Sequence, residues 1–550
     1  MSPQQTKEWP SSAPARADTV PIARTSVPAS EAATQPVMHH NPHSDIAAAV
    51  TERKREISAE MARVRARTLR LVSEVPEALW SRRVHDFYSP IGWHFGHIGM
   101  TEEFWTCGRA LRLAALDDRL CFLFANIPEN PKDNRVHLPS RPAIVAYLAA
   151  TRERALAGLD SAALDSDDPL LADGYAWEFA IQHECQHQET IAELLQLVQQ
   201  YAFGQDSLFA RSESLSAPSV QPRGNLDIVS GGQGAGGPEA KEFIPSLPAP
   251  PSVAPSLSTP SSSDDFVAGA PGSAPSEAHT ARFAALLPAP SAGRQELIKI
   301  PAGAFMMGSD ERHGYDNEKR AHVVEVATFE LAREPVTAGE WIAFIEDGGY
   351  ELPAHWSSEG WAWRNLCDVC LPEYWLRTCD GYACFGAEGL RDVDQDEPVS
   401  SLSWYEADAY ARWAGQRLPT EIEWEYAATL GEAGDRQRFP WGDSPDGAEL
   451  ADCELRCWRP KAVNRLPPAG PAGLRGMAGG VWEWTASPFL PYPGFEAFPY
   501  DGYSKEHMDG RHYACRGGSW ATDRRILRAS FRNWYVPTYR QGFLGVRCAR

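Results

Sequence analysis

The 550-residue sequence contains no apolar run approaching the roughly 20 residues that a membrane-spanning helix needs. Its N-terminus lacks the basic start and following apolar stretch of a secretory signal. Basic residues are also scarce, because 52 lysines and arginines stand against 73 aspartates and glutamates, for a formal net charge of -21. Such a charge repels phosphate backbones. These absences predict a cytoplasmic protein that binds neither membranes nor nucleic acids.

Large apolar side chains are rare in two segments, residues 1–45 and residues 205–294, where runs such as SLPAPPSVAPSLSTPSSSDD occur. These segments bury too little apolar area to offset the entropy lost on ordering. We therefore predict a disordered tail at 1–45 and a disordered linker or insert at 205–294. The eleven cysteines are an odd number scattered along the chain, which favours reduced thiols over a disulfide framework.

Residues 46–204 have the pattern of a helical bundle. Apolar residues recur at three- and four-residue intervals in REISAEMARVRARTLRLVSEV, and a second helix opens with Ser89 as cap and Pro90 at its first position. Further helices are expected over residues 142–159 and 176–201. The sequence predicts four helices in this domain.

Three histidines in this domain form a candidate metal site. The segment IQHECQHQET places His183 and His187 four residues apart, on one face of a helix. The earlier helix, SPIGWHFGHIGMTEEFW, offers His97 as a third imidazole. Three neutral imidazoles can hold a divalent iron and leave positions open for oxygen and substrate. The sequence therefore predicts a metalloenzyme.

Other interpretations of these histidines stay open. An HxxxH pair occurs readily by chance, and a lone helical histidine is usually a surface or core residue. His94 competes with His97 as a ligand, because residues three apart lie near one helix face. The letters HECQH also match the HExxH pattern of zinc peptidases, in which Glu184 would be the general base.

Residues 295–550 differ in composition and pattern, with short β-like stretches, turns rich in glycine and proline, and many tryptophans. Two helices are clear. One is SWYEADAYARWAG, which ends near Gly415, and the other starts at Thr420 with Glu423 completing a capping box. Four cysteines, at 367, 370, 379 and 384, include a CxxC, but their spacing fits no standard zinc module, and loop or core thiols are the favoured interpretation.

The second domain resembles the formylglycine-generating-enzyme, or sulfatase-modifying-factor, fold. The resemblance runs in order through PAGAFMMGS, EPVTAGEW, VSSLSWYEADAYARWAGQRLPTEIEWEYAA, GGVWEWTASPF and RGGSWATDRRILRASFRNW. Formylglycine-generating enzymes bind copper through a C-terminal cysteine pair. Here Cys515 and Cys548 lack that spacing, so their oxidase activity is not expected.

A DinB-like bundle joined to this second domain resembles the ergothioneine sulfoxide synthases. The resemblance implies an α plus α+β chain, with a DinB-like four-helix bundle followed by a C-type-lectin-like, formylglycine-generating-enzyme domain at 295–550. It also implies Fe(II) at His97, His183 and His187, and hercynine, a thiol donor and O2 as substrates. Gln186 would contact hercynine, the trimethylated betaine of histidine.

The same resemblance implies further site residues. In the stretch FPYDGYS, Tyr500 matches the proton donor to reduced oxygen and Tyr503 lies beside the substrate. Asn533 and Trp534 match positions lining the betaine pocket. A quaternary ammonium is best recognised by aromatic faces, and Trp482 and Trp484 also lie in this region, although core packing is their favoured role.

Two departures from the family pattern concern the donor and a calcium site. Synthases that use γ-glutamylcysteine carry an aspartate and, four residues on, an arginine after the Asn-Trp pair. Here these positions are Tyr535 and Tyr539, followed by Arg540. Neutral phenols suit a sugar better than a zwitterionic peptide, so the chain resembles the selenoneine synthase branch, whose donor is a selenosugar. Gly480 replaces the usual asparagine before VWEW, which argues against a nearby calcium site.

The sequence leaves four candidate functions. The favoured one is carbon-selenium bond formation between hercynine and a selenosugar. The first alternative is carbon-sulfur bond formation with γ-glutamylcysteine or cysteine. A DinB-type zinc thiol transferase and a non-catalytic binding module come from other classes.

Overall fold

The computed structural model describes residues 42–73, 75–215, 295–431 and 436–550. Most of the predicted tail and linker lies outside these residues. Residues 42–45 and 205–215 continue helices α1 and α6, so these helices extend beyond the predicted bundle limits of 46 and 204. The contacts described below all belong to one compact unit, Val50–Arg550.

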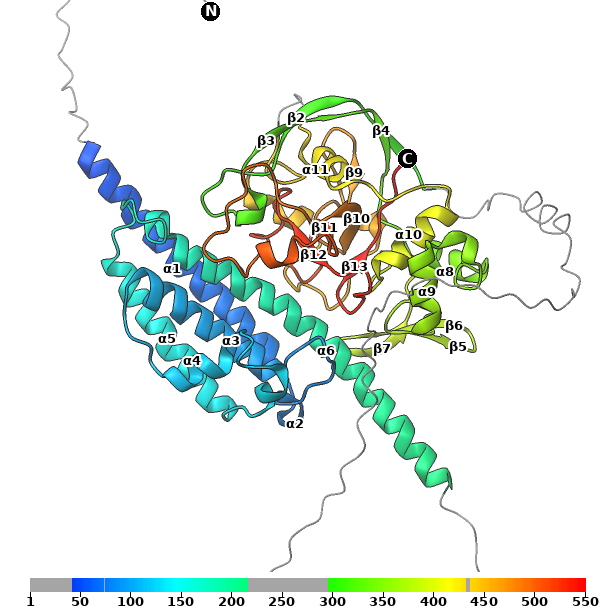
Figure 1. Ribbon diagram of the computed structural model, residues 1–550, viewed down its shortest axis with the longest axis horizontal. Helices are drawn as coiled ribbons and strands as arrows, with labels where there is room; N and C mark the ends of the chain where they lie inside the picture. The colour runs from blue at the N-terminus through cyan, green and yellow to red at the C-terminus, as the bar shows by residue number, and fades with distance from the viewer. Residues whose placement is uncertain (1–41, 74, 216–294, 432–435) are drawn as a thin grey trace, which may run out of the picture. The chain divides into compact units, whose positions relative to one another are not determined.

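Four long helices form the predicted bundle (Figure 1). They are α1 (Pro42–Ser73), α3 (Ile91–Glu102), α5 (Arg141–Ser161) and α6 (Tyr175–Leu215). Shorter elements lie between them: α2 (Glu77–Trp80), a π-helix (Glu103–Ala110) that extends α3, α4 (Asp118–Phe124), and 3-10 turns at Lys132–Val136 and Ala172–Gly174.

The start of α3 differs from the prediction by one residue. Pro90 is the N-cap, the helix begins at Ile91, and no side chain caps it. The hydroxyl of Ser89 instead accepts a hydrogen bond from Arg135 Nη1 at 3.1 Å. The predicted Ser89 cap is therefore wrong, because a buried arginine takes the oxygen that would have bonded the helix N-terminus.

The C-terminal domain consists of small sheets and short helices. Its largest sheet has the strand order β12-β11-β10-β13, in which β10 and β13 are parallel. The other sheets pair β1 with β4, β2 with β3, β8 with β9, and β5 with β6 and β7. The strands are β1 (Leu297–Ile300), β2 (Gly303–Met307), β3 (His322–Val326), β4 (Phe329–Ala332), β5 (Trp375–Thr378), β6 (Gly381–Gly386), β7 (Gly389–Asp392), β8 (Pro468–Ala469), β9 (Leu474–Arg475), β10 (Trp482–Pro488), β11 (Tyr513–Arg516), β12 (Asn533–Tyr535) and β13 (Leu544–Gly545).

Four α-helices accompany these strands, and local capping explains where they begin. They are α8 (Ala338–Glu346), α9 (Ser358–Leu366), α10 (Trp404–Trp413) and α11 (Glu421–Thr429). Thr420 and Glu423 form the predicted capping box of α11, and Gly415 follows α10 with φ of +67°. Both helix predictions are confirmed. Further 3-10 turns cover Asp316–Glu318, Pro353–His355, Pro445–Leu450, Val463–Arg465 and Lys505–His507.

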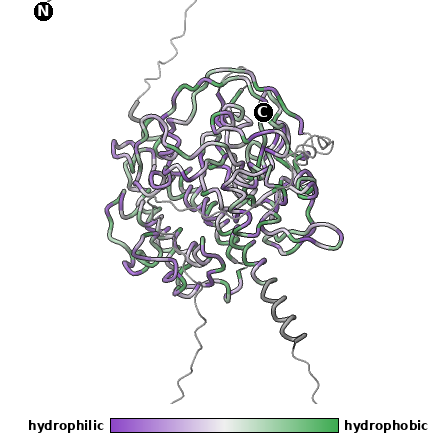
Figure 2. Tube along the Cα trace, turned by 45° about the vertical axis from the view of Figure 1, so that its right-hand side comes forward, coloured by the Kyte–Doolittle hydropathy of each residue, from purple (hydrophilic) through white to green (hydrophobic). Residues whose placement is uncertain are grey.

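A continuous cluster of buried hydrophobic residues runs from the bundle into the C-terminal domain, from Ile57 to Cys548. Hydrophobic and hydrophilic residues alternate along the trace in Figure 2. Across the described segments, no helix is both long enough and apolar enough to cross a bilayer. The shared cluster of buried hydrophobic residues packs the two domains together.

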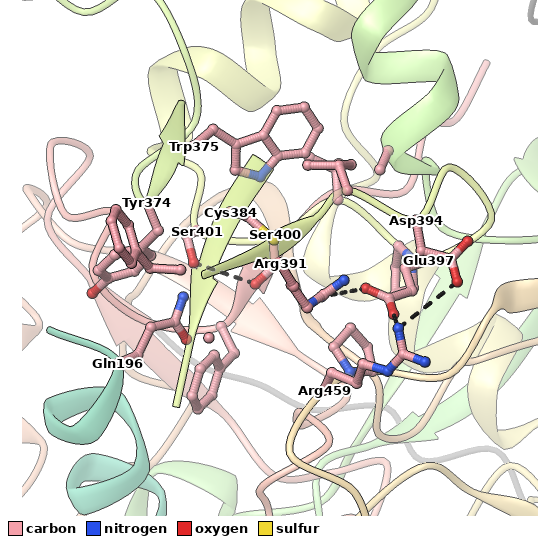
Figure 3. Close-up of a pocket in the computed structure, with 18 of the residues that line it drawn as sticks. Gln196, Tyr374, Trp375, Cys384, Arg391, Asp394, Glu397, Ser400, Ser401 and Arg459 are labelled. Atoms are coloured by element: carbon pink, nitrogen blue, oxygen red, sulfur yellow. Dashed lines mark hydrogen bonds and ion pairs between the residues drawn. The ribbon is translucent and has the colours of Figure 1, made fainter. Parts of the chain in front are cut away.

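The β5-β6-β7 sheet borders a small cavity of about 50 Å³ (Figure 3). Two arginines occupy its polar side, since Arg391 Nη2 and Arg459 Nη1 pair with Glu397 at 2.5 and 3.0 Å. The remaining space suits a few water molecules. A molecule of amino-acid size does not fit there.

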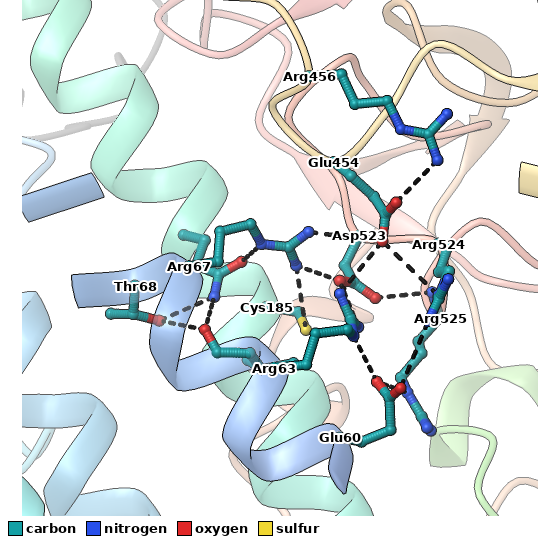
Figure 4. Close-up of polar contacts among 12 residues, drawn as sticks. Glu60, Arg63, Arg67, Thr68, Cys185, Glu454, Arg456, Asp523, Arg524 and Arg525 are labelled. Carbon is teal, nitrogen blue, oxygen red and sulfur yellow. Dashed lines mark hydrogen bonds and ion pairs between the residues drawn. The ribbon is translucent and has the colours of Figure 1, made fainter. Parts of the chain in front are cut away.

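Charged residues join α1 to the C-terminal domain (Figure 4). Asp523 has no exposed side-chain surface and pairs with Arg63 at 3.0 Å and with Arg67. Burial opposes ionisation of this carboxyl, but Arg67 and Arg63 outweigh that effect and hold its pKa below the usual range. Asp523 is thus a buried anion that depends on two guanidinium groups from the other domain.

A stripe of glutamates and glutamines on α6 makes the second contact. The members recur every three or four residues, which places them on one helix face. Gln182 donates to the His313 carbonyl at 2.9 Å and accepts from Arg528 at 3.0 Å. Glu189 accepts from Trp482 Nε1 at 2.8 Å. We call this set the α6 polar stripe: Glu178, Gln182, Gln186, Glu189, Glu193 and Gln196.

We predict that Asp523→Asn destabilises the fold by about 3 kcal/mol, because it removes the fully buried carboxylate that Arg67 and Arg63 share. Glu454 then remains as a more distant partner of both arginines, and Glu60 as a partner of Arg63. Thermal and urea unfolding at pH 7 measure this. In the wild type, the Asp523 contribution is present above the unfolded carboxyl pKa of about 4 and is lost as pH falls below it. Glu52→Gln, in an exposed pair with Arg55 on α1, is the control and should leave the unfolding midpoint unchanged. Equal effects of both variants would contradict the argument.

Candidate metal centre and adjoining cavity

The three predicted histidines come together between α3 and α6. His97, His183 and His187 each offer a ring nitrogen, and these atoms all lie within 4.8 Å of one another. Ring centroids are 4.5 to 5.0 Å apart. Within the described ranges, this is the single group of three or more histidine, cysteine or acidic side chains close enough to hold an ion.

Neighbouring groups fix how two of these rings are oriented. His97 Nδ1 lies 2.6 Å from the Phe124 carbonyl, which can only accept, so Nδ1 carries the proton and Nε2 keeps its lone pair. Trp93 stacks on the same ring at 4.7 Å. His187 Nδ1 lies 3.1 Å from His94 Nδ1, which leaves His187 Nε2 for an ion.

The histidines are neutral at pH 7. Burial, reinforced by the neighbouring imidazoles, lowers the pKa of His183 and His187 well below the usual value. Burial also lowers the pKa of His97 to about 4. Neutral imidazole is the form that binds metal, and an all-nitrogen set suits iron, zinc, copper or nickel. The residues present therefore fit a divalent transition metal.

Two alternatives to this ligand set lose support. His94 lies outside the group of three and contacts it only through His187. Glu184 is held by Arg65 Nε at 2.8 Å and Arg152 Nη2 at 3.1 Å. Burial opposes its ionisation, but these arginines lower its pKa, so Glu184 is a poor general base for peptidase chemistry.

A cavity of about 430 Å³ begins beside His187 and lies between α6 and the C-terminal domain. Sequence patterns did not reveal most of its wall, because the contributing segments are far apart in the chain. It is lined by Phe87, Gln186, His187, Glu189, Thr190, Glu193, Trp482, Tyr503, His507, His512, Ile526, Phe531, Asn533, Trp534, Tyr535 and Val536.

Gln186 is held at the wall by two tyrosines. Its Nε2 donates to Tyr503 Oη at 2.9 Å, and Tyr315 Oη lies 3.5 Å from its Oε1. The rings of Tyr315 and Tyr503 stack at 4.4 Å. Tyr315 carries no sequence signal of this role, since it lies in a turn outside every motif quoted above.

The two predicted active-site tyrosines differ in position. Tyr503 lines the cavity and is partly buried, whereas Tyr500 is 42% exposed, is absent from the lining and stacks on Trp105 at 5.4 Å. The two phenol rings lie 6.4 Å apart. Desolvation raises the pKa of Tyr500 to about 12 and raises that of Tyr503 further. Both phenols stay protonated at neutral pH.

Strand β12 brings Asn533, Trp534 and Tyr535 to the cavity. Trp534 stacks on Phe489 at 4.3 Å and meets the Tyr503 ring edge-on at 5.8 Å. Trp482 also lines the cavity. Trp484, by contrast, is fully buried in the core and bonds the Leu402 carbonyl.

The remaining predicted donor residues lie behind the wall. Tyr539 stacks on Tyr535 at 4.2 Å and is buried. Arg540 pairs with Glu406 at 2.9 Å and with Glu373 at 3.4 Å, outside the lining. The structure therefore places Arg540 in the packing of the C-terminal domain, not in the cavity.

The cysteines form no second site among the residues described. Cys367, Cys370 and Cys379 are exposed and Cys384 is buried in β6. Cys515 and Cys548 are buried free thiols without a disulfide. Neither set joins the group that could hold an ion.

We predict that replacing His97 or His183 with alanine lowers metal affinity by more than about 100-fold, because two imidazoles cannot hold the ion as three do. His94→Phe should lower it by about 10- to 100-fold, since that residue orients His187. Metal content after reconstitution and dialysis measures both effects. His355→Ala, in the C-terminal domain, is the control. Full metal retention by the His97 and His183 variants would exclude this site.

Family models match both parts of the chain: residues 60–191 match the DinB superfamily, and residues 283–550 match the Sulfatase-modifying factor enzyme 1-like domain. The chain is also similar to the formylglycine-generating enzyme of Mycobacterium tuberculosis, with 33% identity over 36% of this chain and 75% of that enzyme. The solved structure of PvdO from Pseudomonas aeruginosa aligns with 46% of this chain and 94% of that one, at 24% identity and a TM-score of 0.34.

Longer similarity extends across both domains. The hercynine oxygenase of Mycolicibacterium smegmatis is 36% identical over 513 residues, which are 90% of this chain and 98% of that protein. The hercynine oxygenase of Mycobacterium tuberculosis is 34% identical over 90% of this chain and 98% of that protein. The predicted two-domain fold is confirmed, while the selenoneine branch stays a prediction. With both domains shared in the same order over nearly the full length of these relatives, the chain belongs to the hercynine oxygenase family.

Proposed function

We propose that this protein couples a thiol or selenol donor to the imidazole ring of hercynine, with O2 as oxidant and iron as the metal. The observation that carries the proposal is a triad of neutral histidines that adjoins an aromatic-lined cavity. Family membership supports hercynine as the acceptor.

The proposed reaction balances with one O2 per coupling. The imidazole C–H and the donor S–H or Se–H bonds break, and a carbon-chalcogen bond forms with loss of two protons and two electrons. Oxidation of the chalcogen to the sulfoxide or selenoxide removes two more electrons. One oxygen atom of O2 enters the product, and the other leaves as water with the two protons.

His97, His183 and His187 would hold the iron. When bound, ferrous iron supplies the redox chemistry that allows O2 to react with closed-shell substrates. The partly buried position of these rings limits the access of bulk water, and the lack of a carboxylate ligand keeps the donor set all-nitrogen.

The chain's own side chains would bind and orient hercynine. Its quaternary ammonium has no hydrogen-bond donor and is suited to the faces of Trp534, Tyr503 and Trp482. The amide of Gln186, held by Tyr503, can bond an imidazole nitrogen, and Asn533 can bond the carboxylate. Holding acceptor and donor in one cavity turns a bimolecular encounter into a local one.

Two protonated phenols can hold the proton that the reaction needs. We assign the acid role to Tyr500 Oη on the resemblance, and Tyr503 Oη is the competing donor because it lines the cavity. The exposed Tyr500 side chain would have to leave its stacking contact with Trp105 and turn toward the cavity to fill this role.

The identity of the thiol or selenol donor is a separate question from the identity of the acceptor. The family resemblance favours carbon-sulfur bond formation with γ-glutamylcysteine or cysteine. The cavity favours an uncharged donor such as a selenosugar, because none of the residues known to line it is a lysine or arginine. A donor carboxylate would lose its hydration there without gaining a fixed cation.

We expect O2-dependent consumption of hercynine by the iron-loaded protein when a thiol or selenol is present. Hercynine with selenoglucose, γ-glutamylcysteine or cysteine is incubated first without and then with O2, and products are identified by mass spectrometry. A kcat/KM at least about tenfold higher for selenoglucose would support the selenosugar donor, and a preference for either amino-acid thiol would support the sulfur alternative. Tightly bound zinc with O2-independent transfer would instead indicate a thiol transferase, and hercynine binding without any turnover would leave a binding module.

We predict that Tyr500→Phe lowers the coupling rate by about 10²- to 10⁴-fold, the usual worth of a general acid, without weakening hercynine binding. Tyr503→Phe is the matched comparison, because it removes the hydrogen bond to Gln186 and should also raise the hercynine dissociation constant. Rapid-mixing kinetics and equilibrium binding separate these effects. A normal rate in Tyr500→Phe with a large loss in Tyr503→Phe would transfer the acid role to Tyr503.

A further inference from the structure

Glu193 is a buried carboxyl in the cavity that no part of the proposed reaction yet uses. It lies on α6 six residues beyond His187, a rise of about 9 Å along the helix. Its side chain is among the cavity-lining residues although the residue is only 4% exposed. Glu193 therefore faces the same space as the metal ligand, about two turns away.

The partners of Glu193 are uncharged. Its Oε2 accepts from Tyr88 Oη at 3.0 Å and lies 3.5 Å from Tyr539 Oη, and the two hydroxyls bond each other at 2.5 Å. On the same helix, Glu178 and Glu184 each pair with two arginines. Burial, and then the nearby Glu189, raises the pKa of Glu193 well above the usual range. A carboxyl in this state both donates and accepts a hydrogen bond.

The other oxygen of Glu193 is free to contact a ligand. No described residue donates a hydrogen bond to Oε1, whereas Oε2 has the two phenols. Oε1 lies beside Gly542, and a side chain at that position would crowd it, since a Cβ there would lie 2.8 Å from Oε1. The adjoining wall is formed by the rings of Phe87 and Tyr535.

We propose that Glu193 is a specificity-determining residue that hydrogen-bonds a hydroxyl group of an uncharged thiol or selenol donor lying against Phe87 and Tyr535. Tyr88 and Tyr539 are positioning residues that hold its carboxyl group. This proposal rests on the function proposed above and identifies the chemical class of the donor. Aromatic faces and a two-way hydrogen-bonding carboxyl are a combination suited to a polyhydroxylated ring. A free donor carboxylate finds no cation here.

The test compares Glu193→Gln with Glu193→Leu in the iron-loaded full-length protein. The amide also donates and accepts, so Glu193→Gln should keep the donor KM within about threefold. The leucine cannot bond a hydroxyl, and its donor KM should rise at least about tenfold. The probes are selenoglucose and 1-thioglucose, and hercynine affinity is measured separately by tryptophan fluorescence without donor. Gln196→Leu, one turn further along the same buried stripe but outside the cavity, is the matched control.

Each result bears on the proposal. An unchanged donor KM in Glu193→Leu, or an equal weakening of hercynine binding, would overturn the assignment. Equal damage by glutamine and leucine would show that an ionised carboxylate binds a cationic donor, and would also overturn it. Thermal unfolding of each variant shows whether it folds. If the Glu193 variants do not fold, Tyr539→Phe provides the same comparison, because it removes one of the hydroxyls that hold the Glu193 carboxyl. If the wild type turned over none of the donors, the proposed function itself would be wrong.

Discussion

Helix α6 contacts two partners at once, helix α3 and the C-terminal domain. The arrangement of the rest of the site depends on these two contacts. His183 and His187 meet His97 of α3, while the α6 polar stripe meets the C-terminal domain. Because both sets are on one rigid helix, the position of the metal ligands relative to the cavity wall is fixed by helix geometry. Hydrogen bonds along the stripe and the Asp523 ion pairs then hold the wall in place. Without this interface there would be two separate surfaces and no shared cavity.

The pKa shifts of the buried carboxyls along α6 follow from the partners of each carboxyl and not from burial alone. Glu178 and Glu184 are buried and paired with arginines, which lower their pKa values. Glu189 and Glu193 are equally buried but have only neutral hydrogen-bond donors, and their pKa values are raised. Charged pairs therefore lie away from the cavity, whereas the two carboxyls that line it have uncharged hydrogen-bond donors. This distribution keeps lysine and arginine away from the residues known to line the cavity.

The cavity combines what each domain can offer. A helical bundle places imidazoles at i and i+4 on one face, which suits a metal but gives little aromatic surface. The C-terminal domain contributes loops and strand edges that carry Trp534, Tyr503 and Tyr535. Gln186 is the link between them, because it is next to a metal ligand and bonded to Tyr503 across the interface. In the proposed function, chemistry at the metal and recognition of substrate would therefore both depend on the contact between α6 and the C-terminal domain.

The sequence by itself determined the two domains, the four bundle helices and the three histidines, because helical periodicity, capping residues and i,i+4 spacing are local properties of the chain. Ordered motifs likewise identified the second domain. Only the tertiary structure decided that the α6 polar stripe is buried, since a regular row of glutamates and glutamines is also typical of a solvated helix face. It alone placed Tyr315 against Gln186 and Glu193 at the cavity, moved Arg540 into an ion pair behind it, and set Tyr500 outside its lining. These outcomes depend on contacts between residues more than 100 positions apart, which no local pattern encodes.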